Sequence, residues 1–368
     1  MKIFRNGSSR LASLGPLLCS VFILFHLRAR TLDSSKQFRV ALSECDKLTT
    51  SLSKLKPTYD FATFAFTDNA GGRWTLENCR RSLRLTYSSL VNSQAEFPRL
   101  HVFTNDLSVA PQSTFKNESV DIVAHYFDPA RLPKNSYSGK SPWKTLSRSK
   151  LDFVERLIKT LQKQIIWIDL DTLVFIDLGV PRRVPWVIGY QNGGCDGARN
   201  CSWEHTAKGG KFDRDIDPKF DALGDLWSLD LRAICAIREY EKMHLSEGLP
   251  LPEYDLQGFF TIMLQDFSLP VFLLHDLINY NFGFFCSNFK HPSATNMELR
   301  AVDGCLSCPR RGNVDMSEAV GAISFTAPTF QSLLLKSDAL NLAWVTDISA
   351  QRWLTRWFLE RDFPSTSC

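Results

Sequence analysis

The sequence has no cluster of basic residues, no internal repeat and no low-complexity tract. Its 43 lysines and arginines against 39 aspartates and glutamates give a net charge of +4, and the basic residues are scattered along the chain. The absence of a basic stripe excludes nucleic acid as an expected partner, and the absence of repeats excludes a solenoid. What remains is an ordinary globular composition, 44% hydrophobic and 22% charged, with 368 residues for one large or two medium domains.

Charged residues are also absent from the apolar run 11–27, which is bracketed by Arg10 and by Arg28 with Arg30. This run is near the lower limit for a membrane-spanning helix, about 17 residues. A cleaved signal peptide is the competing interpretation, but no small-x-small cleavage site follows the run. We therefore expect an uncleaved signal-anchor. The predicted division is a cytoplasmic tail 1–10, a transmembrane segment 11–27, a stem 28–57 and a luminal domain 58–368.

The ten cysteines fit a secretory compartment, where disulfides form and persist. Two pairs are close enough in sequence for local bridges: Cys195 with Cys201, and Cys305 with Cys308. The pairing itself stays open, and a structural zinc site is the weaker alternative because no histidines support the close pairs. Cys368 is a candidate for a free or intermolecular thiol. Two sequons agree with a luminal location: Asn117-Glu118-Ser119 and Asn200-Cys201-Ser202.

Strand and helix patterns alternate along the part of the chain that follows the predicted stem. The segments with strand character are 59–67, 100–104, 120–127, 165–168, 184–190 and 270–274. The segments with helical periodicity are 76–90, 145–163, 229–243, 256–265 and 348–358. This alternation predicts an α/β fold with a parallel or mostly parallel, Rossmann-like sheet that carries helices on both faces.

The pattern is interrupted after Gln191 by several glycines and then by the mixed-charge run 211–230. We expect a long excursion over this part of the chain. Two interpretations stay open: a substrate lid or acceptor-binding loop, and a solvated insertion.

Two acids stand inside the apolar stretch that runs from Gln164 to Ile176, at Asp169 and Asp171. If the stretch is one strand, residues two apart point to the same face. Unpaired carboxylates at the end of a buried strand are costly, and a hard divalent cation relieves that cost. The motif therefore predicts a metal–diphosphate site at the carboxyl edge of the sheet, where open α/β folds bind ligands. The simpler alternative is a strand end whose acids cap the next turn or face solvent.

With this helix–strand context, the chain resembles the GT-A glycosyltransferases, and within them the group that includes glycosyltransferase family 8. The resemblance extends in order of elements from about Tyr59 to Pro292, and its specific part is Ile-Ile-Trp-Ile-Asp-Leu-Asp-Thr-Leu-Val. It implies that Asp169 and Asp171 bind Mn²⁺ (or Mg²⁺), which holds the diphosphate of a nucleotide-sugar, with Asp169 also facing the donor.

The resemblance also implies donor-binding roles for residues before this motif. Thr67 and Asn69, in the loop after the first strand, would contact uracil or ribose; the alternative is that they serve only ordinary turn chemistry. Lys150, on the helix that precedes the motif, would meet the donor phosphates, with Arg148 as the second choice.

Downstream of the motif, the resemblance implies a catalytic Asp255 that orients the transferred sugar or serves as base; the same residue is placed to cap the helix that starts at Leu256. His291 would complete the metal shell, with His275 as the alternative. The glycine and tryptophan that usually follow this histidine in the family are absent here.

The sequence thus predicts a single-pass Golgi (or ER) enzyme that transfers a sugar from a nucleotide-sugar, most simply a UDP-sugar, to a glycan, glycoprotein or glycolipid. Two alternatives remain: a non-catalytic, glycan-binding relative of the same fold, and a haloacid-dehalogenase-like phosphatase. The phosphatase motif requires Asp-x-Asp-x-Thr, whereas Thr172 directly follows the second acid here.

Overall fold

A computed structural model describes part of the chain, and every structural statement below refers to that part. The described residues are 43–45, 47–48, 58–67, 74–94, 99–110, 122–129, 142–175, 186–191, 220–246, 256, 272–273, 279–281, 300–302, 305–307, 322–324 and 348–359.

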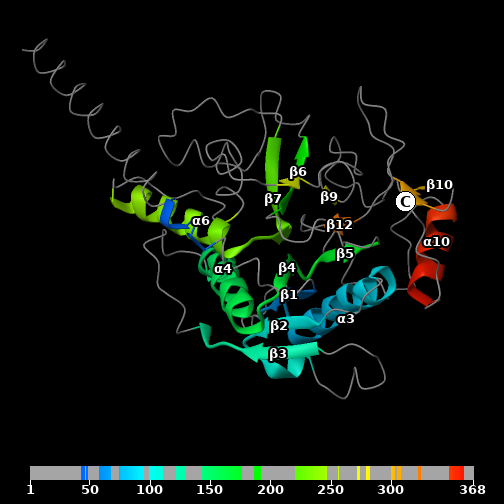
Figure 1. The fold of residues 1–368 in the computed structure, drawn as a ribbon. Helices are drawn as coiled ribbons and strands as arrows, with labels where there is room; N and C mark the ends of the chain where they lie inside the picture. Colours follow the sequence, from blue (N-terminus) through cyan, green and yellow to red (C-terminus); the bar gives the residue numbers. More distant parts are fainter. Residues whose placement is uncertain are drawn as a thin grey trace, which may run out of the picture.

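The centre of the fold is a seven-stranded sheet with the order β3-β2-β1-β4-β7-β6-β8 (Figure 1). Its strands, in that order, are Ile122–Tyr126, Leu100–Thr104, Tyr59–Ala65, Gln164–Ile168, Phe220–Ser228, Trp186–Gln191 and Phe272–Leu273. Strands β3, β2, β1 and β4 are mutually parallel, as are β6 and β8, and β7 runs antiparallel to both of its neighbours. This confirms the prediction of an α/β fold with a mostly parallel, Rossmann-like sheet.

Alternation along β1 divides the core into two halves. Tyr59, Phe61 and Ala65 belong to the cluster on one face, whereas Ala62 belongs to the cluster on the other. Both faces are therefore covered, which explains why the strands read as continuous apolar runs in the sequence.

Helix α3, Leu76–Ser93, covers the first face. Thr75 begins the helix, because its hydroxyl accepts a hydrogen bond from the Asn78 N–H at 3.2 Å. The predicted apolar side is buried against the sheet and includes Cys79, Leu83 and Leu90.

Helices α4, Pro142–Leu161, and α6, Leu231–Ser246, cover the other face, on the left of Figure 1. Leu151, Val154, Leu157 and Ile158 of α4 are buried, as the periodicity predicted. Helix α4 ends at Leu161, and the next residue, Gln162, has a φ of 54°, in the left-handed region that commonly terminates helices.

Strand β7 corrects the prediction of an excursion that reaches residue 230. Phe220–Ser228 is a strand inside the central sheet, between β4 and β6. Trp227 pairs with Trp167 of β4, and the two indole rings stack at 5.7 Å. The acids and glycine of this segment read as a loop, but its end, Leu226–Ser228, is buried and packs like core.

Smaller elements lie beside the sheet. Strand β5, Thr172–Val174, pairs with β12, Ala322–Ser324, which also pairs with β9, Asn279–Asn281. A separate hairpin-like pair joins β10, Arg300–Val302, to β11, Cys305–Ser307. Helix α10, Ile348–Leu359, contacts β10 and α3. A short 3₁₀ turn, η1, spans Leu107–Val109.

Each predicted strand and helix on described residues is present to within a few residues, and of the predicted helix 256–265 only Leu256 is described. Among the described residues, no helix is long and apolar enough to span a membrane. The predicted tail 1–10, the segment 11–27, most of the stem and both sequons lie outside those residues, so the anchor remains a prediction.

Candidate functional site

The two aspartates of the motif lie in a turn at the carboxyl end of β4. The strand ends at Ile168, and the Thr172 N–H donates to the Asp169 carbonyl at 3.0 Å before β5 begins. The expectation that one strand carries both side chains on one face is therefore wrong. The hydrogen bond closes the chain into a tight turn, so the alternation of a strand ends before the motif starts.

Asp169 is held by a cation and an indole. The Lys150 ammonium, on α4, donates to Asp169 Oδ1 at 2.6 Å and to Oδ2 at 2.8 Å. The Trp167 Nε1–H donates to Oδ1 at 2.6 Å, and the ammonium lies 5.5 Å from the Trp167 ring centroid. The side chains of Lys150 and Asp169 are only 13% and 22% exposed, so water screens this ion pair weakly. The structure thus brings together two of the predicted site residues.

Asp171 is 7% exposed, and the backbone around it is bound to α3. The Thr86 hydroxyl donates to the Leu170 carbonyl at 3.0 Å and lies 3.3 Å from the Thr172 carbonyl. Sequence reasoning missed this contact. The available signal was a buried hydroxyl in the middle of the apolar side of a helix, where such residues are unfavourable without a partner.

Thr67 lies at the carboxyl end of β1, next to β4, and therefore at the same sheet edge as Asp169. Its N–H and hydroxyl both donate to Asn105 Oδ1, at 2.8 and 3.1 Å, and the Asn105 amide donates back to the Thr67 carbonyl at 3.0 Å. The Thr67 hydroxyl proton is thus committed to Asn105, which favours the turn interpretation, although the oxygen still has lone pairs to offer a ligand.

The other predicted site residues are not brought to this edge by the described structure. Asn69, Asp255, His291 and the alternative His275 lie outside the described residues, and of Arg148 only the helical backbone is described.

Cys79 is also near this edge, since its thiol donates to the Phe66 carbonyl at 3.4 Å. Burial and the nearby Asp106 raise the pKa of Cys79 to about 12. The thiol is therefore protonated at neutral pH, which excludes it as a nucleophile in this site.

The donor set suits a hard divalent cation. A carboxylate offers about four lone-pair positions, and the three hydrogen bonds to Asp169 leave one of them on Oδ2. Directly after Asp171, the hydroxyl oxygen of Thr172 is buried without a hydrogen-bond partner in the described structure. Oxygen donors of this kind are the ligands of Mg²⁺ and Mn²⁺. Within the described ranges, no three His, Cys, Asp or Glu side chains form a group that could hold a metal ion.

A second polar cluster lies at the opposite, amino edge of the sheet. Asp60 is 1% exposed and accepts hydrogen bonds from Lys163, at 3.1 and 3.2 Å, and contacts His101 at 3.3 Å. His101 Nδ1 lies 2.9 Å from His125 Nε2. Burial favours protonation of Asp60, but the bonds from His101 and Lys163 outweigh it and hold its pKa below the usual range.

No family model matches the sequence, and no curated protein matches it. Among solved structures, the crystal structure of mouse xyloside xylosyltransferase 1 in its apo form is similar, with a TM-score of 0.47 and 14% sequence identity. The similarity covers 74% of this chain and 98% of that chain. A likeness this remote assigns neither fold nor activity. The class of the protein rests on the molecule itself: a mixed α/β chain with a mostly parallel, Rossmann-like sheet and an acidic turn at the carboxyl edge.

Proposed function

We propose that the chain is a GT-A-type glycosyltransferase that uses Mn²⁺ (or Mg²⁺) and a nucleotide-sugar, most simply a UDP-sugar, to glycosylate a glycan or glycoconjugate. One observation carries the proposal. The Asp169–Asp171 turn lies at the carboxyl edge of the sheet, beside the end of β1, and Lys150 brings a cation to the same place. Ligands of open α/β sheets bind at this edge.

The residues have separable roles in this proposal. When bound at Asp169 and Asp171, the metal ion supplies charge neutralisation for a departing nucleoside diphosphate. Lys150 orients the Asp169 carboxylate, and its remaining N–H is available to an oxygen of the donor. Trp167 fixes Oδ1 of Asp169 through its indole N–H, so the free lone pair is on Oδ2. For Asp255, a role in orienting the sugar or activating the acceptor hydroxyl remains part of the proposal, as do Thr67 and Asn69 for the nucleotide and His291 for the metal.

Isothermal calorimetry with UDP, with and without Mn²⁺, tests the proposal. We expect UDP to bind the wild-type chain only with metal present, and the Asp171→Ala variant to lose at least tenfold in affinity because a carboxylate ligand is missing. Asp152→Ala is the matched control, since Asp152 is a half-exposed carboxylate of α4 that pairs with Arg238.

Equal UDP affinity in the presence of a chelator would contradict the metal site. Metal-dependent UDP binding without any sugar transfer would favour the non-catalytic relative. A stable phospho-aspartate at Asp169 would favour the phosphatase.

We also propose a luminal location on the Golgi or ER membrane, anchored by residues 11–27. The disulfide between Cys45 and Cys235 supports an oxidising compartment. We expect glycans on Asn117 or Asn200 when the full chain is expressed in animal cells. The measurement is a mobility shift after glycosidase treatment, with Asn117→Gln and Asn200→Gln variants as controls, and a chain that carries no glycan at either site would count against the luminal location.

A further inference from the structure

We propose that two hydroxyls of helix α3, Thr86 and Ser89, are positioning residues for Asp171. The inference rests on the proposed metal site and adds residues to it that do not touch metal or donor. Both side chains are fully buried, and both bind the backbone of the segment that carries Asp171.

The first contact acts on both sides of Asp171. The Thr86 hydroxyl donates at 3.0 Å to the carbonyl of Leu170 and lies 3.3 Å from the carbonyl of Thr172. One hydroxyl proton is thus shared by the carbonyls of the residues before and after Asp171. The backbone that carries the Asp171 side chain has little freedom to rotate without breaking this contact.

The second contact fixes the strand that follows. The Ser89 hydroxyl accepts the Val174 N–H at 3.2 Å and donates to the Thr86 carbonyl of its own helix at 2.7 Å. Ser89 therefore links the backbone of strand β5 to the part of helix α3 where Thr86 binds the Asp169–Asp171 turn. Since neither hydroxyl is exposed, water does not compete for these bonds.

Helix α3 is a firm support for this contact. Its apolar side, which includes Leu83, Tyr87 and Leu90, is buried in the core under β1 and β2. A displacement of the acidic turn relative to the sheet thus requires either loss of the hydroxyl contacts or movement of a helix that is packed into the core.

The position of Asp171 matters because metal sites tolerate errors of only about 0.5 Å in their ligands. Loss of groups that orient metal ligands typically costs about 10–100-fold in metal affinity. We therefore expect Thr86→Val, which keeps the shape of the side chain and removes the hydroxyl, to weaken Mn²⁺ binding by about this factor.

The test measures Mn²⁺ affinity by calorimetry in the presence of UDP, and hydrogen exchange of the backbone over residues 169–175. Thr86→Val should weaken Mn²⁺ binding about 10–100-fold and speed exchange in this segment. Thr86→Ser, which retains a hydroxyl, should bind Mn²⁺ within about threefold of the wild type. Ser89→Ala should change both readouts in the same direction as Thr86→Val.

Ser82→Ala is the matched control. Ser82 is a fully buried hydroxyl on the same helix that has no hydrogen-bond partner within the described structure. Its loss should leave both the Mn²⁺ affinity and the exchange of residues 169–175 unchanged. Equal effects of Ser82→Ala and Thr86→Val would show a merely structural role and overturn the inference.

Failure of this inference is distinguishable from failure of the proposed function. If the wild type binds Mn²⁺ and Thr86→Val binds it equally well, the positioning role is wrong and the metal site stands. If the wild type binds no Mn²⁺, the proposed function and the metal-positioning role both fail. Should Thr86→Val not fold, Ser89→Ala decides the question by the same two readouts: wild-type values in both would overturn the role, and a loss in both would support it.

Discussion

At the scale of single residues, the centre of the site is a carboxylate with three short contacts. Asp169 receives both an ammonium and an indole N–H, and each comes from a different element, α4 and β4. These contacts fix the orientation of the Asp169 carboxylate between α4 and β4. A side chain that the protein already orients loses less conformational freedom when it binds a ligand.

The contribution of the Lys150–Asp169 ion pair to stability is measurable. Lys150→Met should lower the free energy of unfolding by about 1–3 kcal/mol, because it leaves the mostly buried Asp169 charge without its main partner. Lys159→Met is the control on the same helix: Lys159 pairs with Glu155 but is 60% exposed, so its loss should cost less than about 0.5 kcal/mol. Urea denaturation measures both. Similar losses for the two variants would show that the Lys150 pair has no special weight.

Contacts of single residues were predictable only in part. Asp169 and Asp171 stand out in the sequence because charged residues inside an apolar stretch require a reason, whereas Lys150 was expected near them only from the family resemblance. Thr86 and Asn105 do not stand out, because their roles depend on which turn lies opposite them in space. Periodicity places Thr86 on a buried face but does not identify the carbonyls that it meets.

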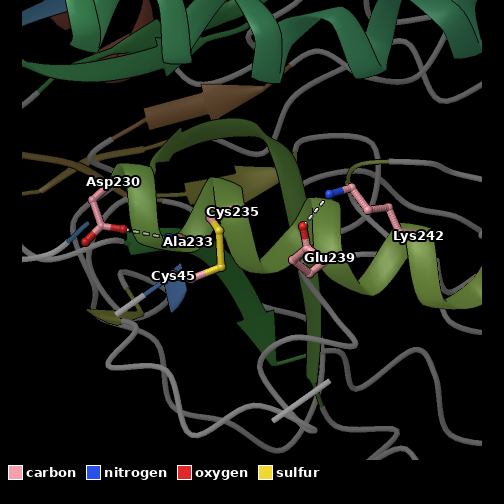
Figure 2. Close-up of a disulfide and its surroundings, with 6 residues drawn as sticks. All are labelled: Cys45, Asp230, Ala233, Cys235, Glu239 and Lys242. Atoms are coloured by element: carbon pink, nitrogen blue, oxygen red, sulfur yellow. Dashed lines mark hydrogen bonds and ion pairs between the residues drawn. A yellow bond between two sulfur atoms is a disulfide. The ribbon is translucent and has the colours of Figure 1, made fainter. Parts of the chain in front are cut away.

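At the scale of elements, the segment that contains Cys45 is joined covalently to helix α6. Asp230 precedes α6, and its carboxylate accepts the Ala233 N–H at 2.7 Å; one turn further, Cys235 forms a disulfide with Cys45 (Figure 2). Burial raises the pKa of Asp230, against the opposing effect of this hydrogen bond. The sequence left the cysteine pairing open because 190 residues separate Cys45 from Cys235, and only the fold brings them together.

Loss of this disulfide should destabilise the protein by about 2–5 kcal/mol, since a cross-link that closes so long a loop removes much entropy from the unfolded chain. Thermal unfolding of Cys45→Ser, Cys235→Ser and the double variant measures the effect. The double variant should be at least as stable as the less stable of the two single variants, because each single change already removes the disulfide. Additive losses would show that the two cysteines act independently.

Whether a segment forms a strand or a helix was also easier to predict than which elements it packs or pairs with. The apolar runs and the helical periodicities gave the parallel half of the sheet and helices α3 and α4 with small errors at their ends. Strand β7 was missed because its acids and glycine read as a loop, and because an antiparallel strand inserted between β4 and β6 leaves no local sign of its neighbours.

At the scale of the whole molecule, two polar regions are separate: the Asp169–Asp171 turn at the carboxyl edge of the sheet, and a cluster that begins at the amino edge with Asp60 and continues through His101 to His125. Burial, together with the neighbouring charges of His101 and Arg156, lowers the pKa of His125 from its ordinary value of 6.5 to about 4. The folded chain therefore holds His125 neutral at a pH where the unfolded chain has protonated it.

Between pH 6.5 and about 4, the unfolded state consequently binds more protons than the folded state, and stability falls as the pH falls. The contribution of His125 is fully present above pH 6.5 and is lost as the pH approaches its folded value. Asp60 loses its own contribution only below its ordinary pKa of 3.8, because its folded pKa is lower still. We expect His125→Gln to reduce the slope of stability against pH between pH 6.5 and about 4.

Urea unfolding of the wild type and His125→Gln at pH 7.0, 5.5 and 4.5 measures this difference. Both proteins contain all the other titrating groups, so the difference between their slopes of stability against pH reports on His125 alone. One of those groups is Asp230, whose raised pKa changes stability with pH in the opposite direction. Parallel curves for the two proteins would contradict the assignment.

The order of strands in the sheet also limits which strands are able to pair while the chain is being synthesised. Strands β1, β2 and β3 are adjacent in sequence and in space, so they are able to pair once residue 126 has left the exit tunnel. The other edge of β1 stays open until β4 has been synthesised. The thiol of Cys45 cannot form its disulfide until Cys235 has been synthesised. An open strand edge and an unpaired thiol are both prone to wrong pairing. The nascent chain is thus prone to wrong pairing until α6 has been synthesised and Cys235 is able to form the disulfide with Cys45.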